Sequence, residues 1–129
     1  MQLQRGEDLE WAQAPQEWFS GTAHFGGQYV PAHADDLNVL GVSFDAGART
    51  DWHTHPAGQV IYVLEGRALV QVDGGERVEA GPGDSVHSPA GELHWHGATP
   101  DAPMIHLSIT YGGATQWVDR KVTDEEYAG

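Results

Sequence analysis

Apolar and polar residues alternate with a period of two in several short segments of this chain. The clearest segments are residues 37–44, 59–64, 68–72, 85–87 and 105–110, and β-branched side chains are frequent in them. Such alternation predicts strands that each bury one face. Glycine- and proline-containing turns, as at residues 73–75 and 81–83, separate the segments. Many short strands joined by tight turns predict an all-β sandwich or barrel.

Helix signals are confined to the two ends of the chain. Residues 7–14 could form a short helix. Near the other end, Thr123 and Glu126 have the spacing of a capping box, which predicts a short terminal helical turn. We interpret residues 1–129 as one domain with a core barrel over about 36–112. Residues 16–35 are expected to add edge strands or an oligomer contact.

Charge and composition narrow the functional classes. The formal net charge is -13, from 19 acidic and 6 basic side chains, which disfavours binding to nucleic acid. The chain has no cysteine, so disulfides, thiolate metal sites and cysteine nucleophiles are excluded. No apolar run has the length of a membrane span or the pattern of a signal peptide, so a cytoplasmic protein without a membrane partner is expected.

Histidines are the most informative residues, and their 8 copies outnumber all lysines and arginines together. His53 and His55 are two apart, so on a strand both imidazoles point to the same side. A turn at residues 56–58 then leads to Gln59, whose amide oxygen can approach the same point. A second glycine- and proline-rich turn, over residues 83–91, precedes His94. Three imidazoles and one amide predict a site for one divalent first-row metal.

These two motifs resemble the paired signatures of the cupin superfamily. The likeness includes residues 18–22, 44–50, 53–56, 91–97 and 122–125, and it is greatest to the manganese-dependent cupin-type hydroxynitrile lyases. Gln59 stands where many cupins have Glu, and Ala98 where Asn is often found. The resemblance implies a double-stranded β-helix, or jelly-roll, barrel. It also implies manganese as the metal, although iron, zinc and nickel suit the same ligands.

Two further histidines are candidates for proton transfer. Within residues 104–110, the period of two puts His106 on the more polar face, which is expected to line the cavity. His106 would then be an unliganded base beside the metal. His96 is two residues beyond His94 and shares its face, which suits a base or an outer-shell donor. The remaining histidines are expected to be structural or at the surface.

Strand alternation also predicts the walls of the substrate pocket. The expected lining faces combine apolar side chains of two strands with one polar position, namely Leu40, Val42, Phe44, Tyr62 and Thr110. Val60 and Leu64 share the face of Tyr62. Relatives with lyase activity tend to have a smaller residue at the position of Leu40 and Gln at that of Thr110. Trp52, Trp95 and Trp117 are expected in the core or at an interface.

Several activities are compatible with this site. An amide in place of a carboxylate leaves the metal with more positive charge, which favours chemistry that develops negative charge on oxygen. A lyase that cleaves or forms a cyanohydrin C–C bond is the first hypothesis. A dioxygenase using iron or manganese and a non-catalytic small-molecule binding protein are alternatives, and an isomerase or decarboxylase stays open. A homodimer or higher homo-oligomer is expected, because exposed sheet edges are commonly covered by closed assemblies.

Overall fold

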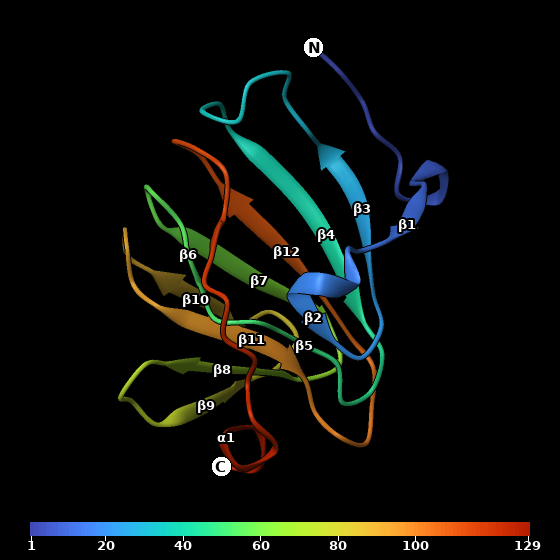
Figure 1. The fold of residues 1–129 in the computed structure, drawn as a ribbon. Helices are drawn as coiled ribbons and strands as arrows, with labels where there is room; N and C mark the ends of the chain where they lie inside the picture. Colours follow the sequence, from blue (N-terminus) through green and yellow to red (C-terminus); the bar gives the residue numbers. More distant parts are fainter.

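The computed structural model describes residues 1–129 as two antiparallel sheets that pack face to face (Figure 1). The six-stranded sheet has the order β1 (Trp11–Gln13), β3 (Ala23–Tyr29), β4 (Asn38–Phe44), β12 (Met104–Thr110), β7 (Gln59–Glu65) and β10 (Ser85–Ser88). The seven-stranded sheet comprises β13 (Gln116–Trp117), β6 (His53–Thr54), β11 (His94–Ala98), β5 (Arg49–Thr50), β2 (Phe19–Ser20), β8 (Ala68–Val72) and β9 (Arg77–Ala80). This confirms the all-β jelly-roll fold expected from the sequence.

The core lies between the inner faces of the two sheets. On β4, β7 and β12 every second side chain points inward, and Phe44, Val63 and Met104 at one end of these strands are fully buried. Small residues opposite them, such as Ala48 and Ala98, complete this cluster. Polar side chains replace apolar ones toward the other end of the same inner faces. The end of the barrel that contains Phe44, Val63 and Met104 is therefore apolar, and the opposite end is polar and rich in histidine.

The inward face of β7 differs from the one expected from the alternation. Gln59 and Ile61 are buried, whereas Tyr62 and Leu64 are 40% and 42% exposed. The reason is geometric: Gln59 points inward at the start of the strand, so the odd-numbered residues follow it. A shift of one residue moves every side chain of a strand to the other face. Tyr62 is thus on the outside of the barrel and does not line a pocket.

The N-terminal segment also differs from expectation. Residues 7–14 do not form a helix: a 3₁₀ turn (Gly6–Asp8) precedes β1, which pairs with β3. The Trp11 ring covers Gly26 and Gly41, where any larger side chain would collide with it. This close approach of an aromatic ring to two glycines explains why the segment is extended, since a helix would not lay Trp11 flat on the sheet. A second 3₁₀ turn (Gln16–Trp18) leads into β2.

The C-terminal end forms as predicted. The helix α1 (Asp124–Ala128) begins at Thr123, and the capping box with Glu126 has both of its hydrogen bonds. Tyr127 packs with Trp52 and Trp95 in a second apolar cluster, and its hydroxyl donates to the Ala98 carbonyl at 2.6 Å. The helix therefore covers the outer face of the seven-stranded sheet, at the lower end of the molecule in Figure 1. No helix is long and apolar enough to span a bilayer.

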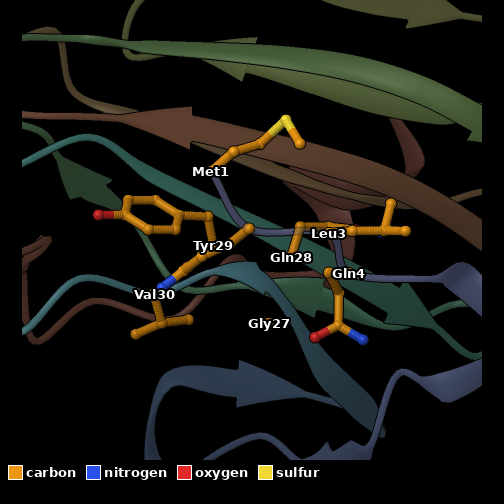
Figure 2. Close-up of a pocket in the computed structure, with 8 residues that line it drawn as sticks. Met1, Leu3, Gln4, Gly27, Gln28, Tyr29 and Val30 are labelled. Atoms are coloured by element: carbon orange, nitrogen blue, oxygen red, sulfur yellow. The ribbon is translucent and has the colours of Figure 1, made fainter.

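The largest hollow in the surface, about 1000 Å³, lies between residues 1–4 and the end of β3. Figure 2 shows the side chains of Met1 and Leu3 along this hollow, with Tyr29 and Val30 near them. Its lining includes no histidine and no carboxylate side chain. It therefore offers no imidazole or carboxylate to a metal, and the candidate histidines lie elsewhere.

Candidate metal centre

Strand pairing brings the two histidine motifs together inside the barrel. His53 on β6 pairs directly with His94 on β11, although 41 positions separate them in the printed sequence. Gln59 begins β7 in the opposite sheet, after the turn at residues 56–58. The His55 carbonyl accepts hydrogen bonds from Gly58 N–H at 3.1 Å and from Gly91 N–H at 3.0 Å. This carbonyl thus joins the turn of the first motif to the turn of the second.

Three of the buried histidines are positioned to hold one metal ion. Ligand nitrogens of His53, His94 and His96 all lie within 4.8 Å of one another. The His53 ring centre is 4.5 Å from that of His94 and 5.0 Å from that of His55. The structure therefore groups two of the predicted ligands, His53 and His94, with His96, and the His55 ring lies next to that of His53. Alternation along β11 accounts for this, because His94 and His96 both point inward.

Backbone carbonyls fix the orientation of two of these rings. His53 Nδ1 lies 2.8 Å from the Asp51 carbonyl oxygen, and His94 Nδ1 lies 2.9 Å from the Glu92 carbonyl oxygen. Each Nδ1 therefore carries the proton and donates it, which leaves the Nε2 lone pair free to bind a metal. Histidines that bind metals in proteins usually have a hydrogen bond of this kind on the other nitrogen.

The contact between Gln59 and His94 is one that a cation would stabilise. Gln59 Oε1 lies 3.0 Å from His94 Nε2, while Gln59 Nε2 donates to Ser108 Oγ at 2.7 Å. With His94 Nδ1–H donating to Glu92, both atoms of the 3.0 Å contact carry lone pairs. Two lone pairs repel at this distance in a buried site unless a positive charge lies beside them. His55 Nε2 is also buried without a hydrogen-bond partner. This donor set fits a divalent metal.

His96 and His106 form a pair beside this cluster. His106 Nε2 lies 3.0 Å from His96 Nδ1, and both side chains are buried. His96 Nε2 has no hydrogen-bond partner and its ring lines a cavity, whereas His106 lies behind it against the ring of Phe44. His96 is therefore the member of the pair that a bound molecule can reach directly.

A cavity of about 50 Å³ opens next to the histidines. Its walls combine site side chains with apolar side chains, and its lining is Phe19, Phe25, Leu40, Val42, Thr50, His53, His55, Gln59, His96, Ser108, Thr115 and Trp117. Of the expected pocket residues, Leu40 and Val42 line it. Phe44 lies under the histidines, Tyr62 is outside the barrel, and Thr110 is one inward position beyond Ser108.

Several lining residues were not identified from the sequence. Phe19 and Phe25 come from the N-terminal strands, for which the sequence predicted only an edge position. Trp117 was expected in the core or at an interface, but it lines the cavity with its ring 4.8 Å from that of His53. The two-residue strand β13 places it there by pairing with β6. A strand of two residues has no detectable alternation, so no local signal could have revealed it.

Comparison with known proteins identifies the family. Residues 41–110 match the family described as "Cupin domain", and these residues include all of the histidines in the cluster. The chain belongs to the cupin family. The chain is also 38% identical to an (R)-mandelonitrile lyase of Granulicella tundricola over 130 residues, which cover 98% of each protein.

Other relatives of this cupin support the fold. A cupin-like protein of Thermotoga maritima has 32% identity and a TM-score of 0.85, with 90% of each chain covered. The dimethylsulfoniopropionate lyase DddQ of Ruegeria pomeroyi is 33% identical over 86 residues, which cover 67% of this chain and 42% of that protein. Two relatives named as lyases thus share this chain's cupin region.

Burial keeps the clustered histidines of this cupin uncharged. Burial, with a smaller contribution from the nearby His94, lowers the pKa of His55 to about 4, while Gln59 opposes the shift. Burial also lowers the pKa of His106 to about 4 and those of His53 and His96 well below 6.5. Neutral imidazoles are the form that binds metals, so the folded protein presents its ligands ready for binding near neutral pH.

Proposed function

We propose that this cupin is a metal-dependent hydroxynitrile lyase, with manganese held by His53, His55, Gln59 and His94. The observation that carries this proposal is the buried histidine cluster opening into a small, partly aromatic cavity. The full-length likeness to an (R)-mandelonitrile lyase supports it. The free Nε2 lone pairs of the three histidines and the oxygen of Gln59 would supply four neutral ligands.

The neutral ligand set determines the charge of the site. No carboxylate lines the cavity, so a divalent cation held there would keep a net charge near +2. Such a cation acts as a Lewis acid and stabilises negative charge that develops on a substrate oxygen. The four proposed ligand side chains are each at most 4% exposed, and this burial makes the electrostatic effect larger than it would be in solution.

His96 is the residue we assign to proton transfer, with His106 as the group that orients it. In cyanohydrin cleavage the hydroxyl proton passes to His96 Nε2, the oxygen forms a carbonyl, and the bond to the nitrile carbon breaks. Cyanide leaves with the electron pair of that bond and takes the proton back from His96, which gives hydrogen cyanide and an aldehyde. The contact between His96 Nδ1 and His106 Nε2 at 3.0 Å keeps the ring in place. Burial lowers the pKa of His96, so its resting form is the neutral imidazole with a lone pair on Nε2.

The cavity suits a compact substrate with one apolar group. Phe25, Leu40 and Val42 form an apolar wall on one side, while His96 and Gln59 line the other. A cyanohydrin can place its hydroxyl against the polar side and its hydrocarbon group against the apolar wall. A charged or extended substrate finds no complementary group here, because no charged side chain lines the cavity.

The test is the cleavage of mandelonitrile by purified protein loaded with Mn²⁺. Benzaldehyde release, followed by its ultraviolet absorbance, is expected at a rate at least about 100-fold above that of the His53→Ala variant, because that variant loses a ligand. Equal rates for the two proteins would remove this function for that substrate. Oxygen uptake with Fe²⁺ and phenolic or dicarbonyl substrates would instead favour the dioxygenase alternative. Tight binding of small molecules without turnover would favour a binding protein.

We also propose that two copies of the chain form a homodimer through the outer face of the six-stranded sheet. The centre of this outer face is apolar, the polar residues Ser43, Ser85 and His87 lie around it, and the Trp11 ring lies beside it; its apolar residues are Val39, Val60, Tyr62, Leu64, Ile105, Leu107 and Ile109. The helix α1 covers the other sheet, whereas the Trp11 ring covers only the part of this face at Gly26 and Gly41. Contiguous apolar faces of this kind mark interaction sites.

Charge and area favour a second copy of this chain as the partner. The six strands of this sheet contain a single charged residue, Glu65, in a chain with 25 charged residues. Two molecules that each carry a net charge of -13 repel one another, so they can approach closely only through an uncharged surface. The six strands have three to seven residues each and cover roughly 550 Å² in projection. The uneven side-chain surface increases this area. The total therefore approaches the roughly 800 Å² that each partner buries in a stable interface.

A charge placed on this outer face is expected to separate the dimer. In a two-fold interface the Tyr62→Asp substitution occurs twice, so the dissociation constant should rise by at least about 100-fold. Sedimentation equilibrium should give twice the 14.0 kDa chain mass for the wild type and the single mass for this variant. Val78→Asp, at a 51% exposed position on β9 of the other sheet, is the matched control and should stay dimeric. A monomeric wild type, or a dimeric Tyr62→Asp variant, would contradict the proposal.

A further inference from the structure

Ser108 touches the candidate metal site through a single hydrogen bond. It lies on the inner face of β12, it is buried, and its Oγ accepts from Gln59 Nε2 at 2.7 Å. The oxygen of the same amide faces His94 Nε2 at 3.0 Å. An amide has two ends of similar shape and opposite hydrogen-bonding character. The partner of one end therefore determines what the other end presents to the site.

We infer that Ser108 is a positioning residue that turns the oxygen end of Gln59 toward the metal. This inference rests on the proposed metal site. If the amide rotated by half a turn, its NH₂ group would lie against His94 Nε2 and donate to that lone pair. The rotated amide would then occupy the ligand atom of His94 and replace an oxygen ligand by a group that no cation binds. The hydrogen bond to Ser108 favours the orientation that leaves both ligand atoms available.

Removing the Ser108 hydroxyl is expected to reverse the preferred orientation of the Gln59 amide. In a Ser108→Ala variant the NH₂ group of Gln59 would be buried without an acceptor in its present orientation. An acceptor that the structure places beside this amide is His94 Nε2, 3.0 Å from Gln59 Oε1, since His94 Nδ1–H already donates to the Glu92 carbonyl. The amide is therefore expected to rotate toward His94 and to compete with the metal.

A carboxylate at position 59 provides the decisive comparison. Both ends of a carboxylate are oxygens, so rotation changes nothing and no orienting partner is needed. The effect of Ser108 on metal affinity should therefore depend on the amide of Gln59. It should largely vanish in a Gln59→Glu background. A loss of general packing at Ser108 would lower metal affinity equally in both backgrounds.

The experiment is a double-mutant cycle on Mn²⁺ affinity, measured by isothermal titration calorimetry on the full chain. Ser108→Ala should raise the Mn²⁺ dissociation constant by about 10-fold to 100-fold, the usual range for losing a group that orients a ligand. Ser108→Thr keeps the hydroxyl and should restore the affinity. Ser85→Ala, which removes the hydroxyl of an exposed serine on β10, is the control and should leave the affinity unchanged. In the Gln59→Glu background, adding Ser108→Ala should change the dissociation constant by less than about 3-fold.

The outcomes separate this inference from the proposed function. A wild-type protein that binds no divalent metal would contradict the metal site itself. A wild type that binds Mn²⁺, with Ser108→Ala equal to it, would overturn only the positioning role. Equal losses of affinity in the Gln59 and Gln59→Glu backgrounds would also overturn it, because they would show that the amide is not what Ser108 acts on.

Discussion

Metal-free protein is expected to lose stability steeply as the pH falls from about 6.5 to about 4. The folded protein holds the pKa of His55 and of His106 at about 4, against a usual value of 6.5, mainly because both are buried. Between these values the unfolded chain binds protons that the folded chain does not, so acidification favours unfolding. The stabilising contribution is complete above pH 6.5 and disappears as the pH falls through about 4.

The expected loss is large compared with ordinary domain stability. A lowering from 6.5 to about 4 corresponds to roughly 3 kcal/mol for each histidine. The pKa values of His53 and His96 shift in the same direction, again chiefly through burial. Domains are typically stable by about 5–15 kcal/mol, so these groups together can unfold the metal-free chain in mild acid. Urea unfolding of chelator-treated protein at a series of pH values measures this directly.

A matched variant separates the contribution of the histidines to the pH dependence of stability from that of the carboxylates. Protonation of the 19 acidic side chains lowers the net negative charge and therefore acts in the opposite direction. His106→Gln removes one buried titrating group that is not a proposed ligand, and it should reduce the slope of stability against pH by about one proton. Bound metal should shift the transition to lower pH, since it binds only the folded form. A stability that stays constant between pH 6.5 and 4.5 without metal would contradict the expected histidine contribution.

Much of this candidate site could be predicted from the spacing of residues, because the side chains that supply its chemistry lie in short sequence motifs. His53 and His55 on one strand and His94 after a second turn indicated a shared centre, and strand pairing does place His53 opposite His94. The capping box at Thr123 was equally local, and it is present. The pair His53 and His55 and the capping box each depend on residues at most three positions apart, where backbone geometry alone fixes the relation between side chains.

The errors concern features that depend on distant parts of the chain. The outward position of Tyr62 follows from Gln59 pointing inward, and the alternation of apolar residues on β7 cannot distinguish the two faces when both are apolar. Trp11 is extended because two glycines from β3 and β4 leave space for its ring. Trp117 reaches the cavity only because β13 pairs with β6. The tight grouping of His96 with His53 likewise needs two strands and could not be assigned from spacing alone.

Replacing Gly58 by Ala is expected to destabilise the protein and to weaken metal binding together. Gly58 has a φ of +94°, and a Cβ at this position would lie 2.7 Å from the Ser88 carbonyl oxygen and 3.2 Å from the Ala90 nitrogen. Both are backbone atoms that cannot rotate away. The left-handed conformation costs about 1–2 kcal/mol, and the collision adds about 1–3 kcal/mol. Thermal unfolding should therefore occur roughly 10 °C lower.

The position of Gly58 connects this loss to the metal site. Its N–H donates to the His55 carbonyl, which also accepts from Gly91 N–H, and the next residue is Gln59. A displaced turn would move His55 and Gln59 relative to His94, so Mn²⁺ affinity should fall at temperatures where the variant is still folded. Gly74 is the matched control, because it has a φ of +76° and no atom within 4 Å of its added Cβ. Gly74→Ala should show only the conformational cost and keep the wild-type affinity. If the two variants had equal unfolding temperatures and affinities, the close contact with Ser88 would not constrain this turn.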